Sequence, residues 1–209
     1  MSTRNNKSFW QRVASFYDFA MKGEREPYKE IEGYIRPYID KDKKVLELCC
    51  GTGELASHLS SFADYWEATD FSDNMIAKAK KRGLYSTHFS VRDAMALPYT
   101  QGSFDVVIIV NALHLFSQPE VVLSEIKRVM KEDGVLIAPT YVYEGGTQKF
   151  ARSIMLNAAG FKVYSKWSAA EYADFITKNG FSVKEQHLIE GKNLPICFIS
   201  ANRTKEGGN

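Results

Sequence analysis

The glycine-rich stretch Val45–Ala56, VLELCCGTGELA, contains the residues best suited to hold a ligand. Gly51 and Gly53 have the spacing of a turn that lets a ligand approach the backbone directly after a strand. In a dinucleotide site, the helix that follows such a turn receives a pyrophosphate at its N-terminus. Glu47 and Glu54 oppose an anion there, because two like charges 4 Å apart repel by about 4 kcal/mol at a dielectric near 20. The stretch favours a ligand with a cationic group, although Glu47 can also be read as a capped or solvated carboxylate at a strand end.

Apolar strand patterns alternate with helical patterns from Lys43 onward. This alternation predicts an α/β fold with a parallel sheet and helices on both faces. The run Phe104–Asn111 is almost wholly apolar, as expected of a strand buried on both sides. The predicted strands are Lys44–Leu48, Tyr65–Asp70, Thr87–Arg92, Phe104–Asn111, Gly134–Tyr141, Phe181–Ile189 and Pro195–Ala201, and the predicted helices are Glu54–Phe62, Asp73–Arg82, Pro119–Lys131 and Ser168–Asn179.

The last two predicted strands are separated only by the short turn Glu190–Asn193. Parallel strands need a crossover of about a dozen residues or more, so these two strands must be antiparallel. We therefore expect a seven-stranded, mostly parallel sheet that ends in a C-terminal antiparallel hairpin.

Two amphipathic stretches precede the first strand. Residues 10–21 and 28–38 have apolar side chains at helical spacing, and the charged stretch Lys22–Glu26 between them has the composition of a hinge. We expect residues 1–40 to form a helical cap that acts as a mobile lid. The main domain is expected at residues 41–203, followed by a flexible tail at residues 204–209.

The composition excludes several classes of protein. With 27 Lys and Arg against 25 Asp and Glu, the net charge of +2 argues against a nucleic-acid partner. No apolar run approaches the roughly 18 residues of a membrane-spanning helix, and the polar N-terminus lacks the apolar core of a secretory signal. Three cysteines, two of them adjacent, form neither a disulfide framework nor a Cys-x-x-Cys zinc motif. We expect a cytoplasmic protein without a bound metal.

Four segments, in order along the chain, resemble the motifs of the class I S-adenosylmethionine-dependent methyltransferases. The resemblance covers about residues 40–203. Together with Phe16–Asp18 it is greatest to the branch of ubiquinone/menaquinone-type and other small-molecule methyltransferases, and it implies a Rossmann-like fold. The four segments are Glu47–Gly53 (an acidic residue before the glycine turn), Ala68–Met75 (an acidic residue ending the second strand), Arg92–Pro98 (the border of the adenine) and Gly102–Val107 (the start of the fourth strand).

The resemblance implies how the adenosine half of the cofactor is held. Asp70 would accept hydrogen bonds from both ribose hydroxyls, as acidic residues do in ribose-binding α/β sheets. Asp93 would accept one from the adenine amino group, and the Ala94 amide would face a ring nitrogen. Phe71 and Met75 would enclose the adenine, although apolar residues at such positions can equally belong to the core.

The methionine half would meet the backbone of Asn111 and Leu113, which follow the fourth strand. His114 lies at the same edge and is the candidate general base, although a lone histidine is more often structural. The resemblance places Tyr17 over the cofactor, with burial in the helix's apolar stripe as the alternative. The motif residues Glu47, Cys49, Gly51, Thr52 and Gly53 complete the predicted cofactor-binding set.

Cys49 departs from the family pattern, which has glycine at this position. Its side chain must fit where the family needs none, so it narrows the space beside the methionine part of the cofactor. A small side chain is tolerable there, so Cys49 does not argue against binding. A reactive-thiol role is the weaker reading, because free cysteines are mostly packing residues.

The implied reaction moves a methyl group from S-adenosylmethionine to an acceptor by in-line displacement and leaves S-adenosylhomocysteine. The fourth strand is followed by Asn111-Ala-Leu-His114, not by the Asn-Pro-Pro-Tyr type of motif or by Pro-Cys, which argues against nucleobase acceptors. Aromatic residues of the N-terminal stretches and of Tyr141–Trp167 favour a small, partly apolar acceptor in a desolvated pocket. The alternatives are a non-catalytic S-adenosylmethionine-binding module and an NAD(P)-dependent oxidoreductase, although the chain has no Tyr-x-x-x-Lys pair.

Overall fold

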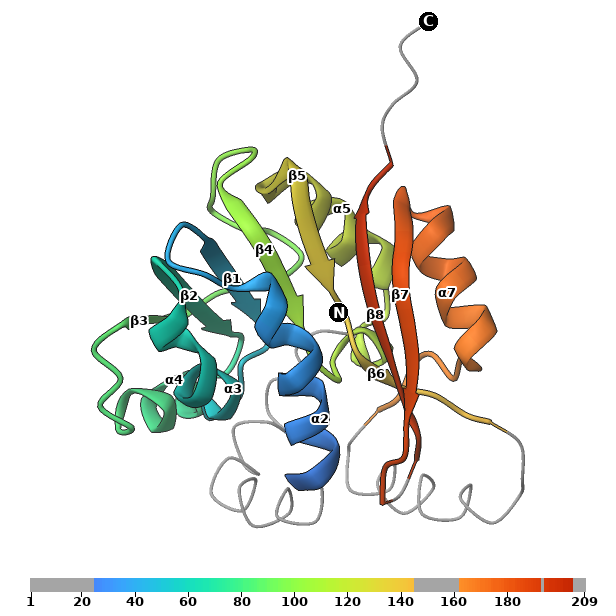
Figure 1. The fold of residues 1–209 in the computed structure, drawn as a ribbon, viewed down its shortest axis with the longest axis horizontal. Helices are drawn as coiled ribbons and strands as arrows, with labels where there is room; N and C mark the ends of the chain where they lie inside the picture. Colours follow the sequence, from blue (N-terminus) through green and yellow to red (C-terminus); the bar gives the residue numbers. More distant parts are fainter. Residues whose placement is uncertain (1–24, 145–161, 193, 205–209) are drawn as a thin grey trace, which may run out of the picture.

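The computed structural model describes residues 25–144, 162–192 and 194–204. Within them an eight-stranded sheet carries helices on both faces (Figure 1). The strands are β1 (Lys44–Leu48), β2 (Tyr65–Asp70), β3 (Thr87–Val91), β4 (Phe104–Ile109), β5 (Met130–Ile137), β6 (Thr140–Tyr141), β7 (Phe181–Ile189) and β8 (Ile196–Arg203). The helices are α2 (Arg25–Ile35), α3 (Glu54–Leu59), α4 (Asp73–Lys80), α5 (Pro119–Val129) and α7 (Ala169–Lys178), with 3-10 turns η2 (Arg36–Tyr38), η3 (Ser60–Phe62) and η4 (Leu113–Leu115).

The sheet topology confirms the predicted architecture. The strands follow one another across the sheet in the order β3-β2-β1-β4-β5-β8, and β7 pairs with β8. Strands β1 to β5 are parallel, whereas β8 is antiparallel to both β5 and β7. The C-terminal pair of strands is therefore the antiparallel hairpin that its short connection requires.

The eighth strand arises because the predicted strand Gly134–Tyr141 is interrupted. Ile137 faces Ser200 and Thr140 faces Cys197, so β6 continues β5 along β8 in the same register. Pro139 lies in the gap and has no amide hydrogen to donate to a neighbouring strand. Strand β5 also starts earlier than predicted, because α5 ends at Val129 and not at Lys131.

Alternate residues of each central strand belong to two separate hydrophobic clusters. Val45 and Ile108 pack with α2, α3 and α4, whereas Leu46 and Ile109 pack with α5 and α7. The central strands are thus buried on both faces, as their apolar sequences predict. None of the helices that the structure describes has the length and apolarity needed to cross a bilayer.

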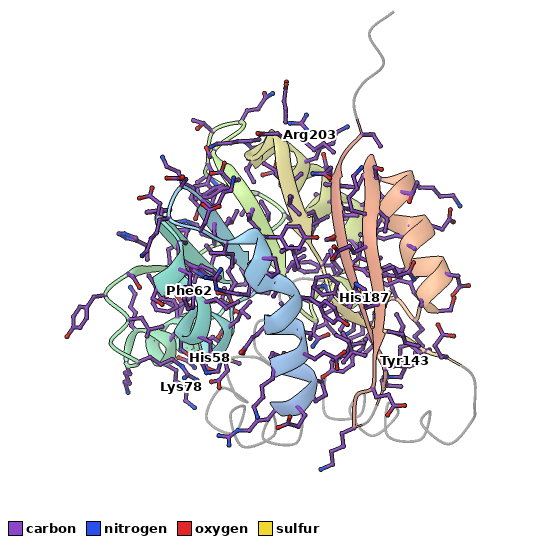
Figure 2. All side chains as sticks on the ribbon, viewed as in Figure 1. His58, Phe62, Lys78, Tyr143, His187 and Arg203 are labelled. Carbon is purple, nitrogen blue, oxygen red and sulfur yellow. The ribbon has the colours of Figure 1, made fainter. Side chains whose placement is uncertain are left out.

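Helix α2 packs into one of these clusters. Ile31 and Ile35 are fully buried there, and the hydroxyl of Tyr38 donates a hydrogen bond to Ser200 Oγ at 2.9 Å. The ring of Tyr34 stacks on that of His187 in β7, with centroids 4.3 Å apart (Figure 2). Residues 25–38 are therefore part of the packed core. The mobile lid at residues 1–40 stays a prediction, and its residues 1–24 lie outside the described residues.

The carboxyl ends of β1 and β4 lie side by side at the centre of the sheet (Figure 1). From this point the chain winds outward in both directions, through β2 and β3 on one side and β5 on the other. Such a switch point leaves a crevice beyond the strand ends, where open α/β sheets bind ligands. The predicted site residues after β1, β2 and β4 meet at this edge.

We predict that Gly53→Ala destabilises the protein by about 1–3 kcal/mol more than Gly83→Ala does. Both glycines have left-handed backbones, with φ of +75° and +70°, so alanine is strained at each by a similar amount. A Cβ at Gly53 would lie 3.0 Å from the Phe89 ring and 3.1 Å from Ala79, whereas a Cβ at Gly83 meets nothing within 4 Å. Urea unfolding of both variants measures the difference, and equal losses would contradict this packing role for Gly53.

Candidate functional site

The carboxylate of Asp70 joins the glycine loop to the turn after β2. Its Oδ2 accepts a hydrogen bond from the Gly51 amide at 3.0 Å, and its Oδ1 accepts one from the Ser72 amide at 2.8 Å. Burial raises the pKa of Asp70, and these amide hydrogen bonds counteract the rise. A carboxylate has about four acceptor positions, so two amides leave room for further donors such as hydroxyls.

Glu47 is buried at the end of β1, so the solvated-carboxylate reading is wrong. Its Oε2 accepts a hydrogen bond from Trp66 Nε1 at 2.9 Å. Burial raises the pKa of Glu47 to about 8, with a smaller contribution from the nearby charge of Asp70. An anion placed beside the Glu47 and Asp70 carboxyl groups would raise their pKa values further, whereas a cation would lower these pKa values and favour the ionised forms.

Cys49 adopts the left-handed backbone conformation that the family's glycine would allow, with φ of +57°. A side chain in this region costs of the order of 1–2 kcal/mol, so the strain is concentrated beside the predicted ligand. The half-buried side chain packs against the cluster of α5 and α7. Burial first, and then the neighbouring carboxylates, raise the pKa of the Cys49 and Cys50 thiols, which argues against a reactive thiolate.

Glu54 at the start of α3 is held in an ion pair. The side chain of Arg82 pairs with Glu54, and Arg82 Nε donates to the Thr52 carbonyl at 2.7 Å. The charge of Glu54 is therefore partly neutralised and repels an anion less than the sequence suggests. A pyrophosphate is disfavoured for a different reason. The Gly51 amide donates its hydrogen bond to the Asp70 carboxylate, so it is not available to a phosphate oxygen.

The predicted adenine segment forms a tight turn beside Asp70. The Arg92 amide donates to the Asp70 carbonyl at 3.0 Å, and Asp93 Oδ1 accepts from the Met95 amide at 2.9 Å. Ala94 is buried, and Phe71 is half-buried just after β2. Met75 is 1% exposed, so protein atoms already cover this side chain and leave little of its surface for a ligand.

Asn111 has an unusual geometry at the end of β4. Its backbone is left-handed, with φ of +51°, and its amide donates to the Pro139 carbonyl at 2.8 Å. The side-chain Nδ2 donates to the hydroxyl of Tyr28 at 3.4 Å, whereas the buried Oδ1 has no hydrogen-bond partner among the described residues. Leu113 starts the following turn and is 1% exposed.

His114 is buried and structurally held. Its Nδ1 is 2.8 Å from Thr140 Oγ1, and its carbonyl accepts from the amides of Tyr164 and Ser165 at 3.0 and 3.2 Å. Burial lowers the pKa of His114 to about 4, so the imidazole is neutral at pH 7 and a weak proton acceptor. The role of His114 as a base is still a prediction, and Tyr17 lies outside the described residues.

The structure adds partners that the sequence did not single out. Trp66, Arg82 and Thr140 each hold a predicted site residue or its loop, and Tyr28 reaches Asn111 from α2. Only Tyr28 had a sequence signal, as a member of the second amphipathic stretch. The other three lie in elements whose pairing and packing bring them to the loop.

Comparison with known proteins identifies the family. A methyltransferase-domain model matches residues 45–134. The demethylmenaquinone methyltransferase of Lactococcus lactis is 31% identical in an alignment of 177 positions, and the match covers 78% of this chain and 69% of that protein. This chain belongs to the class I S-adenosylmethionine-dependent methyltransferases. The family includes the demethylmenaquinone methyltransferases, and its members are enzymes that use S-adenosylmethionine.

Two solved structures have the same fold. One is the complex of the Haloferax volcanii Trm112 methyltransferase activator with a methyltransferase, with a TM-score of 0.82, 18% identity and coverage of 97% of this chain and 99% of that chain. The other is the DhpI–SAH complex, with a TM-score of 0.76, 22% identity and coverage of 98% of both chains. The likeness extends over nearly the whole of this methyltransferase, well beyond the matched domain.

The described residues fit S-adenosylmethionine. Asp70 retains acceptor positions for ribose hydroxyls, and the buried Oδ1 of Asn111 is an acceptor without a partner among the described residues. A positive charge on the ligand would favour the ionised forms of Glu47 and Asp70, whose pKa values burial raises. The donors and charges of the site therefore agree with the cofactor of the family.

We predict that the free energy of unfolding falls between about pH 6.5 and 8 and that Glu47→Gln reduces this slope. Native Glu47 keeps its proton up to about pH 8, whereas the unfolded carboxyl loses it near its ordinary value of 4.5. The unfolded state then binds fewer protons, so stability decreases as pH rises, by at most about 1.4 kcal/mol per pH unit for one group. Urea unfolding at several pH values measures the slope.

The window begins at pH 6.5 because His114, with its lowered pKa, gives the opposite slope between about pH 4 and 6.5. Burial also raises the pKa of Asp70, so this group contributes a slope of the same sign above its ordinary pKa. The exposed Glu120→Gln is the matched control and should behave as wild type. An unchanged slope in Glu47→Gln would show that Glu47 is not the titrating group.

Proposed function

We propose that this methyltransferase transfers a methyl group to a small, partly apolar acceptor in a desolvated pocket at the carboxyl edge of the sheet. The observation that carries the proposal is the Asp70 carboxylate, which holds the glycine loop by the Gly51 amide and still offers acceptor positions at the switch point. This arrangement supports a ligand with hydroxyls and positive charge. It argues against the pyrophosphate of an NAD(P)-dependent oxidoreductase.

The proposed cofactor contacts follow the order of the strands. Asp70 accepts from the ribose hydroxyls, with Gly51, Thr52 and Gly53 beneath it. Asp93 and Ala94 face the polar edge of the adenine. Phe71 and Met75 face the rings of the adenine. The backbones of Asn111 and Leu113 meet the methionine end beside Glu47 and Cys49.

The chain's task in the reaction is placement. When bound, S-adenosylmethionine supplies an activated sulfonium methyl group that an acceptor atom displaces in line. Holding the acceptor in near-attack geometry can contribute roughly 7–11 kcal/mol. Exclusion of water keeps the acceptor free of a hydration shell that would slow it.

Proton removal is needed only if the acceptor keeps its proton at the working pH. The lowered pKa of His114 makes it a weak base unless the bound acceptor changes its surroundings. The geometry supports a positioning role instead, because His114 ties Thr140 to the segment that begins at Lys162. We propose that this contact shapes one wall of the acceptor pocket.

Aromatic side chains support an apolar acceptor. The ring of Tyr141 packs edge-on against His114, with centroids 5.9 Å apart, and the Tyr143 amide donates to the Trp167 carbonyl at 2.8 Å. These contacts bring residues 141–143 and 162–167 together beside the strand ends. Demethylmenaquinone, the acceptor named for the Lactococcus relative, is the first compound to test, in the reduced hydroquinone form that can act as the nucleophile.

We predict that S-adenosylmethionine and S-adenosylhomocysteine stabilise the protein more than NAD or NADP at equal concentration. A ligand that binds only the native state adds RT ln(1 + [L]/Kd), about 2.7 kcal/mol at a hundredfold excess over Kd. Thermal unfolding with each of the four ligands measures this. Release of S-adenosylhomocysteine is then followed across an acceptor panel that includes demethylmenaquinone. A thermal shift with NAD alone would contradict the proposal, and binding without turnover on any acceptor would favour the non-catalytic module.

We predict that Asp70→Asn lowers the affinity for S-adenosylhomocysteine about ten- to hundredfold, because it removes charge-assisted hydrogen bonds worth roughly 1.5–3 kcal/mol. Asp70 also holds two backbone amides, so the variant loses stability as well. Ser72→Ala is the matched control: it removes the cap of α4, which costs about 1 kcal/mol, and leaves the carboxylate in place. Calorimetric titration of both folded variants separates the effects. Equal affinities in the two would place the ribose elsewhere.

A further inference from the structure

The connection between β3 and β4 has no helix or strand of its own. Residues 92–103 run from the adenine turn at Asp93 to the start of β4 as loop and turns. Backbone groups in such a segment are satisfied by its own turns, by side chains or by water. For Leu97 and Tyr99 the partners come from α5, and a second anchor comes from β2.

An ion pair on α5 holds the backbone of this segment. Glu125 and Arg128 form a two-pronged pair, with Arg128 Nε and Nη2 each 2.8 Å from a carboxylate oxygen. The Leu97 amide donates to Glu125 Oε2 at 2.7 Å. Arg128 donates to the carbonyls of Leu97 and Tyr99 at 2.8 and 2.6 Å. One guanidinium thus spans two carbonyls and a carboxylate, which the ammonium of lysine cannot do.

A buried carboxylate on β2 holds the side chain of Tyr99. Glu67 Oε1 accepts from the Tyr99 hydroxyl at 2.9 Å and from Ser90 Oγ at 2.5 Å, while Oε2 accepts from the Tyr65 hydroxyl at 2.7 Å. The Tyr99 ring also packs edge-on against Phe104, with centroids 5.1 Å apart. The segment is therefore fixed from α5 through its backbone and from β2 through its side chain.

We propose that Arg128, oriented by Glu125, is a positioning residue for the adenine end of the cofactor site. The inference rests on the proposed function, which places the adenine beside Asp93 and Ala94. The turn between Asp93 and Leu97 is short and internally bonded, since the Met95 and Ala96 amides both donate to Asp93. Fixing Leu97 therefore fixes the direction of the Asp93 carboxylate and the Ala94 amide.

The decisive variant is Arg128→Lys, which keeps the positive charge and loses the planar guanidinium that donates from three nitrogens. We expect a Kd for S-adenosylhomocysteine about three- to tenfold higher than in wild type, the size of one lost hydrogen bond. The KM for S-adenosylmethionine rises by the same factor, while kcat at saturating cofactor and the KM for the acceptor stay within twofold. A purely structural loss would not produce this split.

The adenine provides a more specific measurement. In S-inosylhomocysteine a carbonyl replaces the adenine amino group of S-adenosylhomocysteine. In the proposed site, that amino group donates a hydrogen bond to the Asp93 carboxylate. Wild type should therefore bind the adenosyl compound more tightly, and Arg128→Lys should reduce this preference. Tyr99→Phe, which removes one hydroxyl from Glu67, should change the preference in the same direction by a smaller factor and covers the case in which Arg128→Lys does not fold.

Arg203→Lys is the matched control. Arg203 also donates to a backbone carbonyl, that of Met130 at 3.3 Å, but it lies at the edge of the sheet where β5 begins (Figure 2). It should lose some thermal stability and keep the wild-type Kd and preference. If Arg128→Lys behaves in this way too, while Asp93→Ala weakens binding, the positioning role is overturned and the proposed site stands. If Asp93→Ala also binds as wild type, the adenine lies elsewhere and both proposals fall.

Discussion

The arrangement of the site depends on one carboxylate, that of Asp70. It accepts hydrogen bonds from the amides of Gly51 and Ser72 and so connects the loop after β1 to the turn before α4. Parallel strands do not by themselves fix the loops beyond their ends. Here a side chain at the end of β2 does so, and the left-handed backbone of Cys49 persists because the loop is held on both sides. The strain of this residue is compensated by packing and hydrogen bonds elsewhere.

The ionisable groups around the glycine loop affect which ligand the site binds. Glu47 is buried and Asp70 half-buried near the glycine loop, and burial raises the pKa of each. Arg82 reaches the loop through the Thr52 carbonyl and pairs with Glu54. A negatively charged ligand would raise the pKa values of Glu47 and Asp70 further, whereas a positive charge beside them would favour their ionised forms. The same fold that binds pyrophosphates in other proteins is tuned here by two acids.

Most of the fold could be predicted from the sequence because its signals are local. The apolar run Phe104–Asn111, the capping serine Ser72 and the short turn before β8 each predict their element without knowledge of the rest. The break at Pro139 was missed because the apolar pattern continues through it, and only the lost amide interrupts the ladder. The apolar spacing of α2 does not distinguish packing on the sheet from covering a ligand, since one apolar face suits both.

The site was harder to predict than the fold. Motif spacing identified the loop, Asp70 and Asp93, but the neutralisation of Glu54 by Arg82 joins residues 28 positions apart. The partner of the His114 ring is Thr140 on β6, 26 positions further along the chain. Burial decides the pKa of Glu47 and His114, and burial is set by tertiary packing that no local pattern records. The residues were found by their type, whereas their chemical state required the structure.

The account's central claim is that the cofactor lies across the switch point with its ribose on Asp70. A crystal structure of the protein with S-adenosylhomocysteine tests this most directly. We predict that both ribose hydroxyls lie within hydrogen-bond distance of the Asp70 carboxylate, which keeps its bonds to Gly51 and Ser72, and that the adenine amino group faces Asp93. Ligand density away from the ends of β1 and β2, or a ribose that leaves Asp70 untouched, would contradict it.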